Sequence, residues 1–433
     1  MTKKKAKKPA RDVKIRMYNT GFGDCFLLHL PGQDRELKVL IDCGKHTHST
    51  CRPSIKEIVK QLHTDLRQDG TTRIDLLVVT HRHLDHVSGF ALDGWNEVEV
   101  GEVWMPWTED PNDDEARAIC ERQSRRALQL QALIPALNLD PAYTAHLLGY
   151  AGNNLTNAAA MRLLHEGFRG NPKRRFLPEE KKKNAQDTGH VAATLIETDQ
   201  LPGVEIHVLG PSRNPDIIRD MDPPQGESFL RAAAAAAAGA AAGGKPKSPF
   251  PDTCAMDRKT YINRFHNPLT DFDEKTAEHF RRVMQNPEME LAATLEKSVN
   301  GTSLVLLFKI GRALLLFPGD AQWGTWNDIL SDERKRRLLE NVSFLKVGHH
   351  GSHNATPRRF VQDLLPATAC AMIPTDNVKQ WPMIPKEELV NSLRAKGVPF
   401  VRSDVADAGD DARFLRHAVN GHTVYIDLEL STS

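Results

Sequence analysis

A run of potential metal ligands directly after an apolar segment is the feature that most constrains this chain. Residues 76–79, Leu-Leu-Val-Val, read as a buried strand, and His81, His83, Asp85 and His86 follow it closely. In an extended chain His81 and His83 share one face, and a turn into a helix would direct the next two ligands toward a second point. Imidazole and carboxylate bind zinc, manganese and iron, so the spacing favours two adjacent metal ions. The alternative is a set of surface histidines with Asp85 as a helix cap.

Histidine is concentrated in two short windows of the chain. Residues 81–86 and 349–353 together hold six of the 18 histidines. An even distribution over 433 residues would place about 0.5 histidines in these 11 positions. Since the carboxyl ends of strands are where open α/β sheets bind ligands, we expect both windows to contribute to one site.

Apolar runs bounded by turn residues predict an α/β protein. A helix is expected over 54–66, where Ile55, Ile58, Val59 and Leu62 recur at helical spacing, and another over 386–396. The predicted strands are 13–18, 25–30, 37–41, 74–79, 191–197, 204–209, 303–310, 313–317, 343–347, 370–373, 400–401 and 424–428.

Two long stretches, at about 109–188 and 213–293, interrupt this pattern. The first is helical and charge-rich, and its basic end, 171–184, is expected to be a flexible loop. The second contains the alanine- and glycine-rich run 232–244, which predicts a linker or an exposed helical flap. Residues 1–12 read as a basic flexible tail, with a nucleic-acid or anionic-surface contact as the alternative.

Composition excludes several classes of protein. The 57 Lys and Arg residues against 56 Asp and Glu leave a net charge of +1, which argues against a generally basic nucleic-acid binder but leaves local patches open. A hydrophobic fraction of 40% excludes whole-chain disorder. Without an apolar run long enough to span a membrane, or a secretory signal, we expect a soluble cytoplasmic protein. The six cysteines lack the spacing of a thiolate zinc site.

The histidine-rich motif is the signature of the metallo-β-lactamase superfamily, and three further segments resemble landmarks of that superfamily. Leu40–Gly44 resembles the early strand end whose aspartate, Asp42, supports the metal loop. Leu314–Asp320 resembles the strand end whose aspartate, Asp320, bridges two metals. Phe344–Ser352 resembles the last ligand loop. The resemblance implies an αββα sandwich.

Within the superfamily, the chain is similar to the hydrolase domain of the ComEC competence proteins and their soluble relatives. Gly21–Cys25, Asn300–Val305 and His349–Ser352 carry this similarity. It extends over about 13–108, 190–212 and 295–430 and implies a single catalytic domain, 13–433, interrupted by the two insertions.

The resemblance implies a ligand set for two divalent ions, with Zn²⁺ expected first and Mn²⁺ or Fe²⁺ as alternatives. His81 and His83 would hold one ion, and Asp320 would bridge. The other ion would be held by Asp85, His86 and one of the pair His349 and His350.

Four further residues are expected to support the centre. Asp24 and Asp42 would stabilise its loops, although Asp24 reads equally well as a turn former. Many superfamily members place another histidine where this chain has Asn300 and Ser303. An amide is a weak ligand, so one metal position would stay open; His190 could fill it, but its place in the chain order is wrong.

A dinuclear centre predicts hydrolysis by a metal-bridging hydroxide. Asp85, His350 and His353 are the candidates for a direct catalytic role, because a histidine not bound to metal can hydrogen-bond an oxyanion or protonate a leaving group. For His353 the alternative is simple loop exposure.

The favoured function is a phosphodiesterase or nuclease acting on nucleic acid or a nucleotide. One alternative is hydrolysis of a small ester, lactone, amide or phosphocholine-type substrate. The other is a metal-stabilised interaction or sensing module that binds a protein partner through the helical insertions. No membrane partner is expected, and the oligomeric state is left open. Tryptophans such as Trp104, Trp107, Trp323, Trp326 and Trp381 could stack bases, but core packing is the favoured reading.

Overall fold

The computed structural model describes residues 12–68, 70–134, 141–155, 157–179, 194–224, 226–229, 287–379, 381–405 and 411–433. The predictions made for the basic tail up to residue 11, for Lys181–Lys183, for His190 and for the alanine-rich run lie outside these residues.

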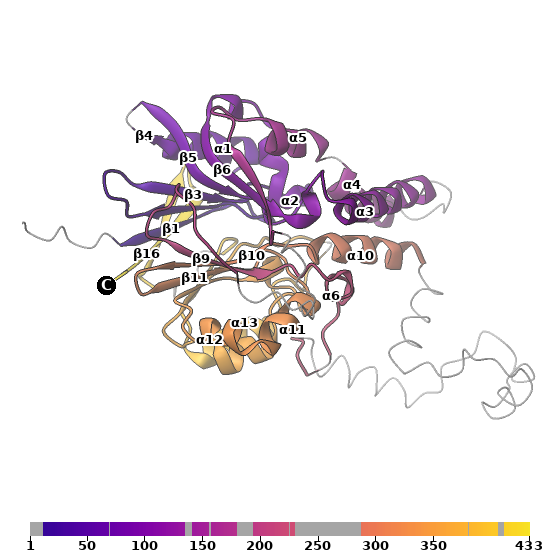
Figure 1. The fold of residues 1–433 in the computed structure, drawn as a ribbon. Coiled ribbons are helices and arrows are strands. Elements are labelled where there is room, and N and C mark those ends of the chain that lie inside the picture. The colour runs from indigo at the N-terminus through magenta and orange to yellow at the C-terminus, as the bar shows by residue number, and fades with distance from the viewer. Residues whose placement is uncertain are drawn as a thin grey trace, which may run out of the picture.

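The first sheet is mixed, with the strand order β15-β16-β1-β2-β3-β5-β6-β7, and β4 pairs with β5 (Figure 1). Strands β15 to β3 run antiparallel to their neighbours, whereas β3, β5, β6 and β7 are parallel. The strands are β1 (Val13–Tyr18), β2 (Phe26–Leu30), β3 (Leu37–Ile41), β4 (Arg67–Gln68), β5 (Thr71–Val78), β6 (Glu99–Pro106), β7 (Lys173–Leu177), β15 (Phe414–Val419) and β16 (His422–Leu430).

The second sheet is also mixed, with the order β14-β13-β12-β11-β10-β9-β8. Strands β11 to β14 are parallel, and β8 to β11 are antiparallel. The strands are β8 (Thr194–Ile196), β9 (Glu205–Gly210), β10 (Val305–Ile310), β11 (Ala313–Phe317), β12 (Phe344–Lys346), β13 (Cys370–Ile373) and β14 (Phe400–Arg402).

The two sheets pack face to face, with helices on their outer faces (Figure 1). Ile15 and Leu28 of the first sheet and Leu306 and Phe317 of the second belong to the core between the sheets. Helices α1 (Ile55–Leu66) and α5 (Ala158–Glu166) cover the first sheet. Helices α11 (Trp323–Ser331), α12 (Glu333–Leu339) and α13 (Glu387–Lys396) cover the second.

Helix α1 shows how local sequence determines these elements. Ser54 caps its N-terminus in a reciprocal capping box with Glu57. Its apolar side chains, Ile58, Val59 and Leu62, recur on one face and are buried against the sheet. The predicted helix over 54–66 is therefore confirmed.

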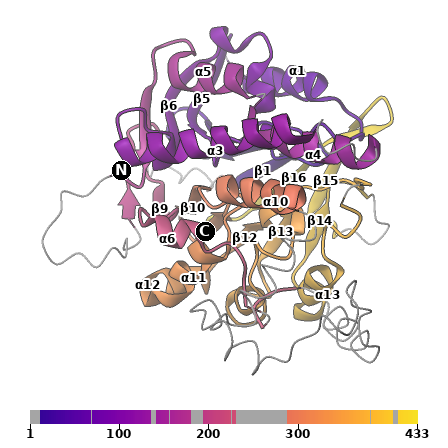
Figure 2. The ribbon, with the colours of Figure 1, turned by 90° about the vertical axis from the view of Figure 1, so that its right-hand side faces the viewer.

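The helices of the two insertions pack against each other at one end of the sheets (Figure 2). They are α3 (Asp114–Leu133), α4 (Pro141–Leu155) and α10 (Pro287–Asn300). Leu130, Leu147 and Leu295, one from each helix, share a small apolar core. A short helix, α6 (Pro215–Arg219), lies beside α11. The helical prediction for the first insertion is confirmed, and the segments predicted as separate interruptions form a common layer.

One element corrects the sequence prediction. The basic stretch 171–184 was expected to be a flexible loop, but Lys173–Leu177 forms β7 and pairs in parallel with β6. The guanidinium of Arg174 donates hydrogen bonds to the carbonyls of Leu164, Gly167 and Pro172, so its N–H groups find acceptors within the fold. Strands β6 and β15 were not predicted either.

The tryptophans are mostly core residues. Trp104, Trp107 and Trp326 are buried, which confirms packing as their role, while Trp381 is partly exposed. Among the described helices, none combines the length and apolar character needed to cross a membrane.

Candidate metal centre

The histidine motif lies where β5 ends and a short helix, α2 (Leu84–Val87), begins. Asp42, at the end of β3, accepts hydrogen bonds from the backbone N–H of Thr80 at 2.7 Å and from its hydroxyl at 2.6 Å. The neighbouring parallel strands therefore fix the turn that presents the motif. This is the supporting position expected for Asp42.

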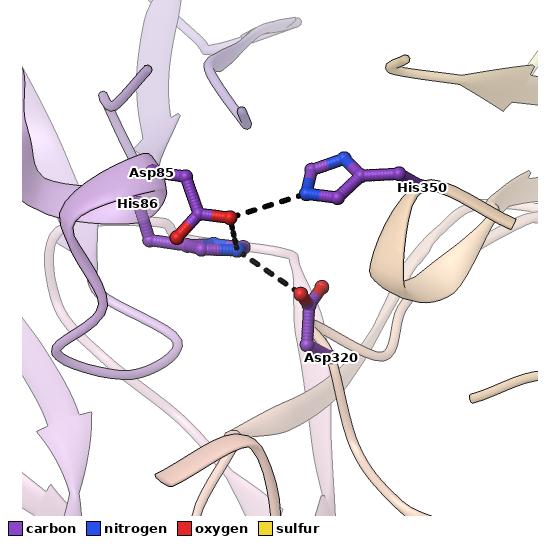
Figure 3. A group of neighbouring side chains, drawn as sticks. All are labelled: Asp85, His86, Asp320 and His350. Atoms are coloured by element: carbon purple, nitrogen blue, oxygen red, sulfur yellow. Dashed lines mark hydrogen bonds and ion pairs between the residues drawn. The ribbon is translucent and has the colours of Figure 1, made fainter. Parts of the chain in front are cut away.

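Four potential ligands from both sheets converge beside this turn (Figure 3). Asp85 and His86 come from α2, Asp320 follows β11, and His350 follows β12. His350 Nε2 lies 3.2 Å from Asp85 Oδ2, and His86 Nε2 lies 3.3 Å from Asp320 Oδ2. All four side chains are buried, and one ligand atom from each lies within 4.8 Å of the others.

His81 and His83 form an adjoining pair. His81 Nε2 lies 3.1 Å from His83 Nδ1, and the rings of His81 and His86 have centroids 4.1 Å apart. Ser303 Oγ lies 3.2 Å from His81 Nδ1, on the side of the ring away from His83. The six residues expected to surround two ions therefore occupy one continuous site.

Two donors bind one carboxylate oxygen of Asp320 and leave the other free to face the cluster. Its Oδ1 accepts hydrogen bonds from the backbone N–H of His349 at 3.0 Å and from Lys346 Nζ at 3.1 Å. Its backbone N–H donates to Ser303 Oγ at 3.1 Å. Oδ2 is consequently the oxygen that faces the cluster.

A buried lysine that the sequence analysis missed links two aspartates behind the cluster. Lys346 Nζ forms ion pairs with Asp24 and Asp320, and all three side chains are buried. Asp24, Asp42 and His86 form a second group of potential ligand atoms, in which Asp42 Oδ2 lies 2.8 Å from His86 Nδ1. A carboxylate on the far nitrogen of a ligand histidine fixes the ring's orientation.

The structure distinguishes between His349 and His350. The His350 ring faces Asp85 through Nε2, while its Nδ1 lies 2.9 Å from the carbonyl oxygen of Pro374. The His349 ring lies beside Asn300, with Nε2 3.4 Å from Asn300 Nδ2, and is not one of the four clustered side chains. Both residues have positive φ angles, 46° and 54°, a costly conformation that turns the two rings in different directions.

Charges within the cluster oppose the effect of burial. Burial disfavours the charged form of His86, but Asp320 and Asp24 outweigh it and raise the pKa of His86 well above its usual range. Burial acts to raise the pKa of Asp85, yet His86 and His350 lower it overall. Burial and the neighbouring His86 lower the pKa of His81.

Unpaired atoms test whether a metal would fit. Among the described residues, Asp85 Oδ1 and His86 Nε2 are buried without a hydrogen-bond partner. Buried polar atoms are normally paired, so such a concentration indicates a missing cation or water. The donor set of imidazole and carboxylate suits zinc, manganese or iron.

A second missed contribution comes from the insertion helices. Glu296 of α10 has a side chain that is 16% exposed, and its Oε2 lies 3.7 Å from His83 Nε2. Burial raises the pKa of Glu296 to about 8. Asn153 of α4 donates hydrogen bonds to both carboxylate oxygens, at 3.2 and 3.3 Å. Neither position carries a motif that could have identified it.

A pocket of about 330 Å³ adjoins the centre and shares His349 and Glu296 with it. On its aromatic side Phe22 packs against His350, with centroids 4.0 Å apart, and stacks on Trp381 at 5.1 Å. The lining also includes the polar residues Lys297, Ser352, His353, Asn354 and Lys386.

His353 lies on the pocket wall and is not a member of the ligand cluster. Burial, reinforced by the nearby Lys386, lowers the pKa of His353 to about 4. Its side chain is partly buried, so it is not a freely exposed loop residue.

The structure thus brings together all the residues predicted as ligands except His349, whose backbone N–H alone contacts the cluster. Asn300 lies at the end of α10 beside the His349 ring, and Ser303 lies beside His81. Compared with known proteins, the chain matches no protein-family model and no curated protein.

Proposed function

We propose that the protein is a metal-dependent hydrolase of phosphodiester bonds, with a metallo-β-lactamase-like αββα fold and one catalytic domain over residues 13–433. The observation that carries the proposal is the convergence of Asp85, His86, Asp320 and His350 from two sheets. The adjoining pair His81–His83 extends this cluster.

The roles of the ligands are those that the resemblance implies. His81 and His83 would hold one divalent ion, Asp85, His86 and His350 would hold the other, and Asp320 would serve both. Zn²⁺ is our first expectation, with Mn²⁺ or Fe²⁺ as alternatives. When bound, such a pair of ions supplies hydroxide at neutral pH and neutralises charge on the attacked phosphoryl oxygen.

The chain's own residues would orient these ligands and the substrate. Asp42 fixes the ring of His86, and Lys346 fixes Asp320 while compensating its buried charge. His353, which is neutral above its lowered pKa, faces the pocket and can hold a hydrogen bond to a leaving group.

The pocket supports a substrate with a flat ring and a negative charge. Phe22 and Trp381 offer an aromatic wall, and Lys386 brings positive charge to the pocket lining, whereas the charge of Lys297 is already compensated by Asp222 at 2.6 Å. Within the described residues Lys386 has no carboxylate within ion-pair distance. Lys386 would repel the ammonium of a phosphocholine group, so nucleic acid or a nucleotide is the substrate class that we favour.

One further feature fits the same proposal. The five described cysteines are free, as expected in a reducing compartment such as the cytoplasm. The interaction module stays the alternative, because Leu128 and Leu133 of α3 and Leu148 of α4 remain exposed beside the apolar core that the insertion helices share.

The direct test combines metal analysis with a substrate panel. Purified protein is measured for bound zinc, manganese and iron, then assayed on a small model phosphodiester, single- and double-stranded DNA, RNA, a lactone and glycerophosphocholine. We expect bound metal and phosphodiester cleavage that is lost in D320N and H83A. Activity that persists without metal, or equal activity in the variants and the parent, would overturn the proposal.

A further inference from the structure

Two residues of the insertion helices enclose the middle of the histidine motif. Asn153 Oδ1 accepts a hydrogen bond from the backbone N–H of Leu84 at 2.9 Å. Asn153 Nδ2 donates to the Glu296 carboxylate, and Glu296 Oε2 lies 3.7 Å from His83 Nε2. A continuous chain of polar contacts therefore runs from Leu84 at the start of α2 to Asn153 of α4. It continues to Glu296 of α10 and returns to the ring of His83, the residue before Leu84.

The two nitrogens of the His83 ring face different neighbours, His81 and Glu296. Nδ1 lies 3.1 Å from His81 Nε2, so these two nitrogens point toward a common position. Nε2 points the opposite way, toward Glu296, and has no hydrogen-bond partner among the described residues. Metal-bound histidines generally donate the N–H of their other nitrogen to a carboxylate or carbonyl, which fixes tautomer and ring orientation.

We propose that Glu296, held in place by Asn153, is the positioning residue that fixes His83 with Nδ1 toward the metal centre and Nε2–H toward the carboxylate. The inference rests on the proposed metal centre. The contact of 3.7 Å is longer than a hydrogen bond, so the proposal requires the two side chains to move closer when metal binds.

The hydrogen-bond donors around position 296 require a carboxylate there. Two donors converge on this side chain, the Nδ2 group of Asn153 and the Nε2–H group of His83. A carboxylate has two acceptor oxygens and satisfies both. The pKa of Glu296 is about 8 in the metal-free chain, and a cation bound at the adjacent centre would favour its ionised form. An amide has one acceptor oxygen and would turn its own NH₂ group toward one of the two donors, so Glu296→Gln disturbs the contact without removing volume.

The role assigned to Glu296 also gives the layer of α3, α4 and α10 a function. Asn153 lies in the first insertion and Glu296 lies in α10, just past the predicted end of the second insertion, yet these side chains 143 positions apart meet at one ligand. The packing of α4 against α10 through Leu147, Ala151 and Leu295 holds the two side chains next to each other. The helical layer therefore completes the support of the centre.

The test measures metal binding rather than turnover. Zinc is titrated against a chromophoric competitor for the parent, E296Q, N153A and the double variant, with E121Q on the exposed side of α3 as the matched carboxylate-to-amide control. We expect E296Q to weaken one of the two zinc sites by about 10- to 100-fold. N153A should weaken the same site, the double variant should resemble E296Q because the two residues act together, and E121Q should match the parent.

Two further measurements separate positioning from folding. Histidine ¹⁵N spectra of the zinc-loaded parent should show His83 protonated at Nε2, and this signal should move in E296Q. E296D, which keeps the carboxylate on a shorter stem, should restore part of the affinity even if E296Q unfolds. Two tightly bound zinc ions in both the parent and E296Q, with unchanged His83 signals, would overturn this inference and leave the proposed function intact. Absence of metal binding by the parent would overturn both.

Discussion

Asp85 Oδ2 lies 3.2 Å from His350 Nε2, and this contact joins the ends of the two sheets that carry the ligand cluster across 265 positions of the sequence. His349, the adjacent residue, reaches the cluster through its backbone N–H. The two histidines therefore have different surroundings, although the sequence presents them as equivalents.

H350A should lose one of the two metal ions, because it removes a side-chain ligand. H349A should retain both, since alanine keeps the backbone N–H that donates to Asp320 Oδ1. Metal content after dialysis checks the pair, with each variant serving as the control for the other. Loss of metal from H349A and its retention in H350A would reverse the assignment.

Lys346→Met should lower the free energy of unfolding of the chelator-treated protein by about 3–5 kcal/mol, because it leaves buried Asp24 and Asp320 without a cation. Lys309→Met is the control, since the Lys309–Glu205 pair is partly exposed and should contribute less than about 1 kcal/mol. Urea unfolding measures both variants. Similar losses in the two would show that Lys346 does not compensate the aspartates.

His353 should make the chelator-treated protein sensitive to acid. Its pKa falls from an ordinary value of about 6.5 to about 4 in the folded chain, so the folded state binds fewer protons than the unfolded state. Its contribution is complete above about pH 6.5 and is lost as the pH falls toward about 4, by at most about 3 kcal/mol. Buried His81 and His83, whose pKa values are also lowered, act in the same direction, whereas His86, whose pKa is raised, acts in the opposite one.

The comparison of the parent with H353Q isolates this contribution. Unfolding free energies measured at about pH 7 and about pH 4.5 should differ less in H353Q than in the parent. Identical pH dependence in the two proteins would show that His353 is accessible to water.

Removal of metal should abolish hydrolysis before it unfolds the chain. The core between the sheets, with residues such as Leu28, Leu306 and Phe317, does not include the ligand cluster and stays buried without it. Activity and far-ultraviolet circular dichroism are followed together during chelation, and readdition of zinc should restore turnover. Cooperative loss of the spectrum with the metal would contradict this independence.

Local pattern was sufficient for much of the fold. The predicted bounds of β1, β3, β11 and β13 coincide with the strands in the structure, because apolar runs between turn residues are buried there on both faces. The motif residues His81–His86 likewise lie at a strand end, as the pattern indicated.

Tertiary partners explain what the pattern missed. β7 contains Lys173, Arg174 and Arg175, and a basic run of this kind reads as a solvated loop unless its hydrogen-bond acceptors are known. Glu296 sits beside Lys297 in a helix that looks surface-exposed, and its partners lie far away in the sequence. Lys346 reads as the polar end of an apolar run, although its ammonium group is buried.

The pairing of β1 with β16 has a consequence for synthesis of the chain. β1 is an interior strand of the first sheet, and its neighbour β16 is made some four hundred residues later, with Val13 opposite Leu430. Until residues 422–430 have been translated, β1 presents an open hydrogen-bonding edge to other chains. The guanidinium of buried Arg16 likewise gains its hydrogen bonds to the Asp427 carboxylate only after that residue has been translated. A nascent chain of this protein therefore needs protection from aggregation until translation has passed β16.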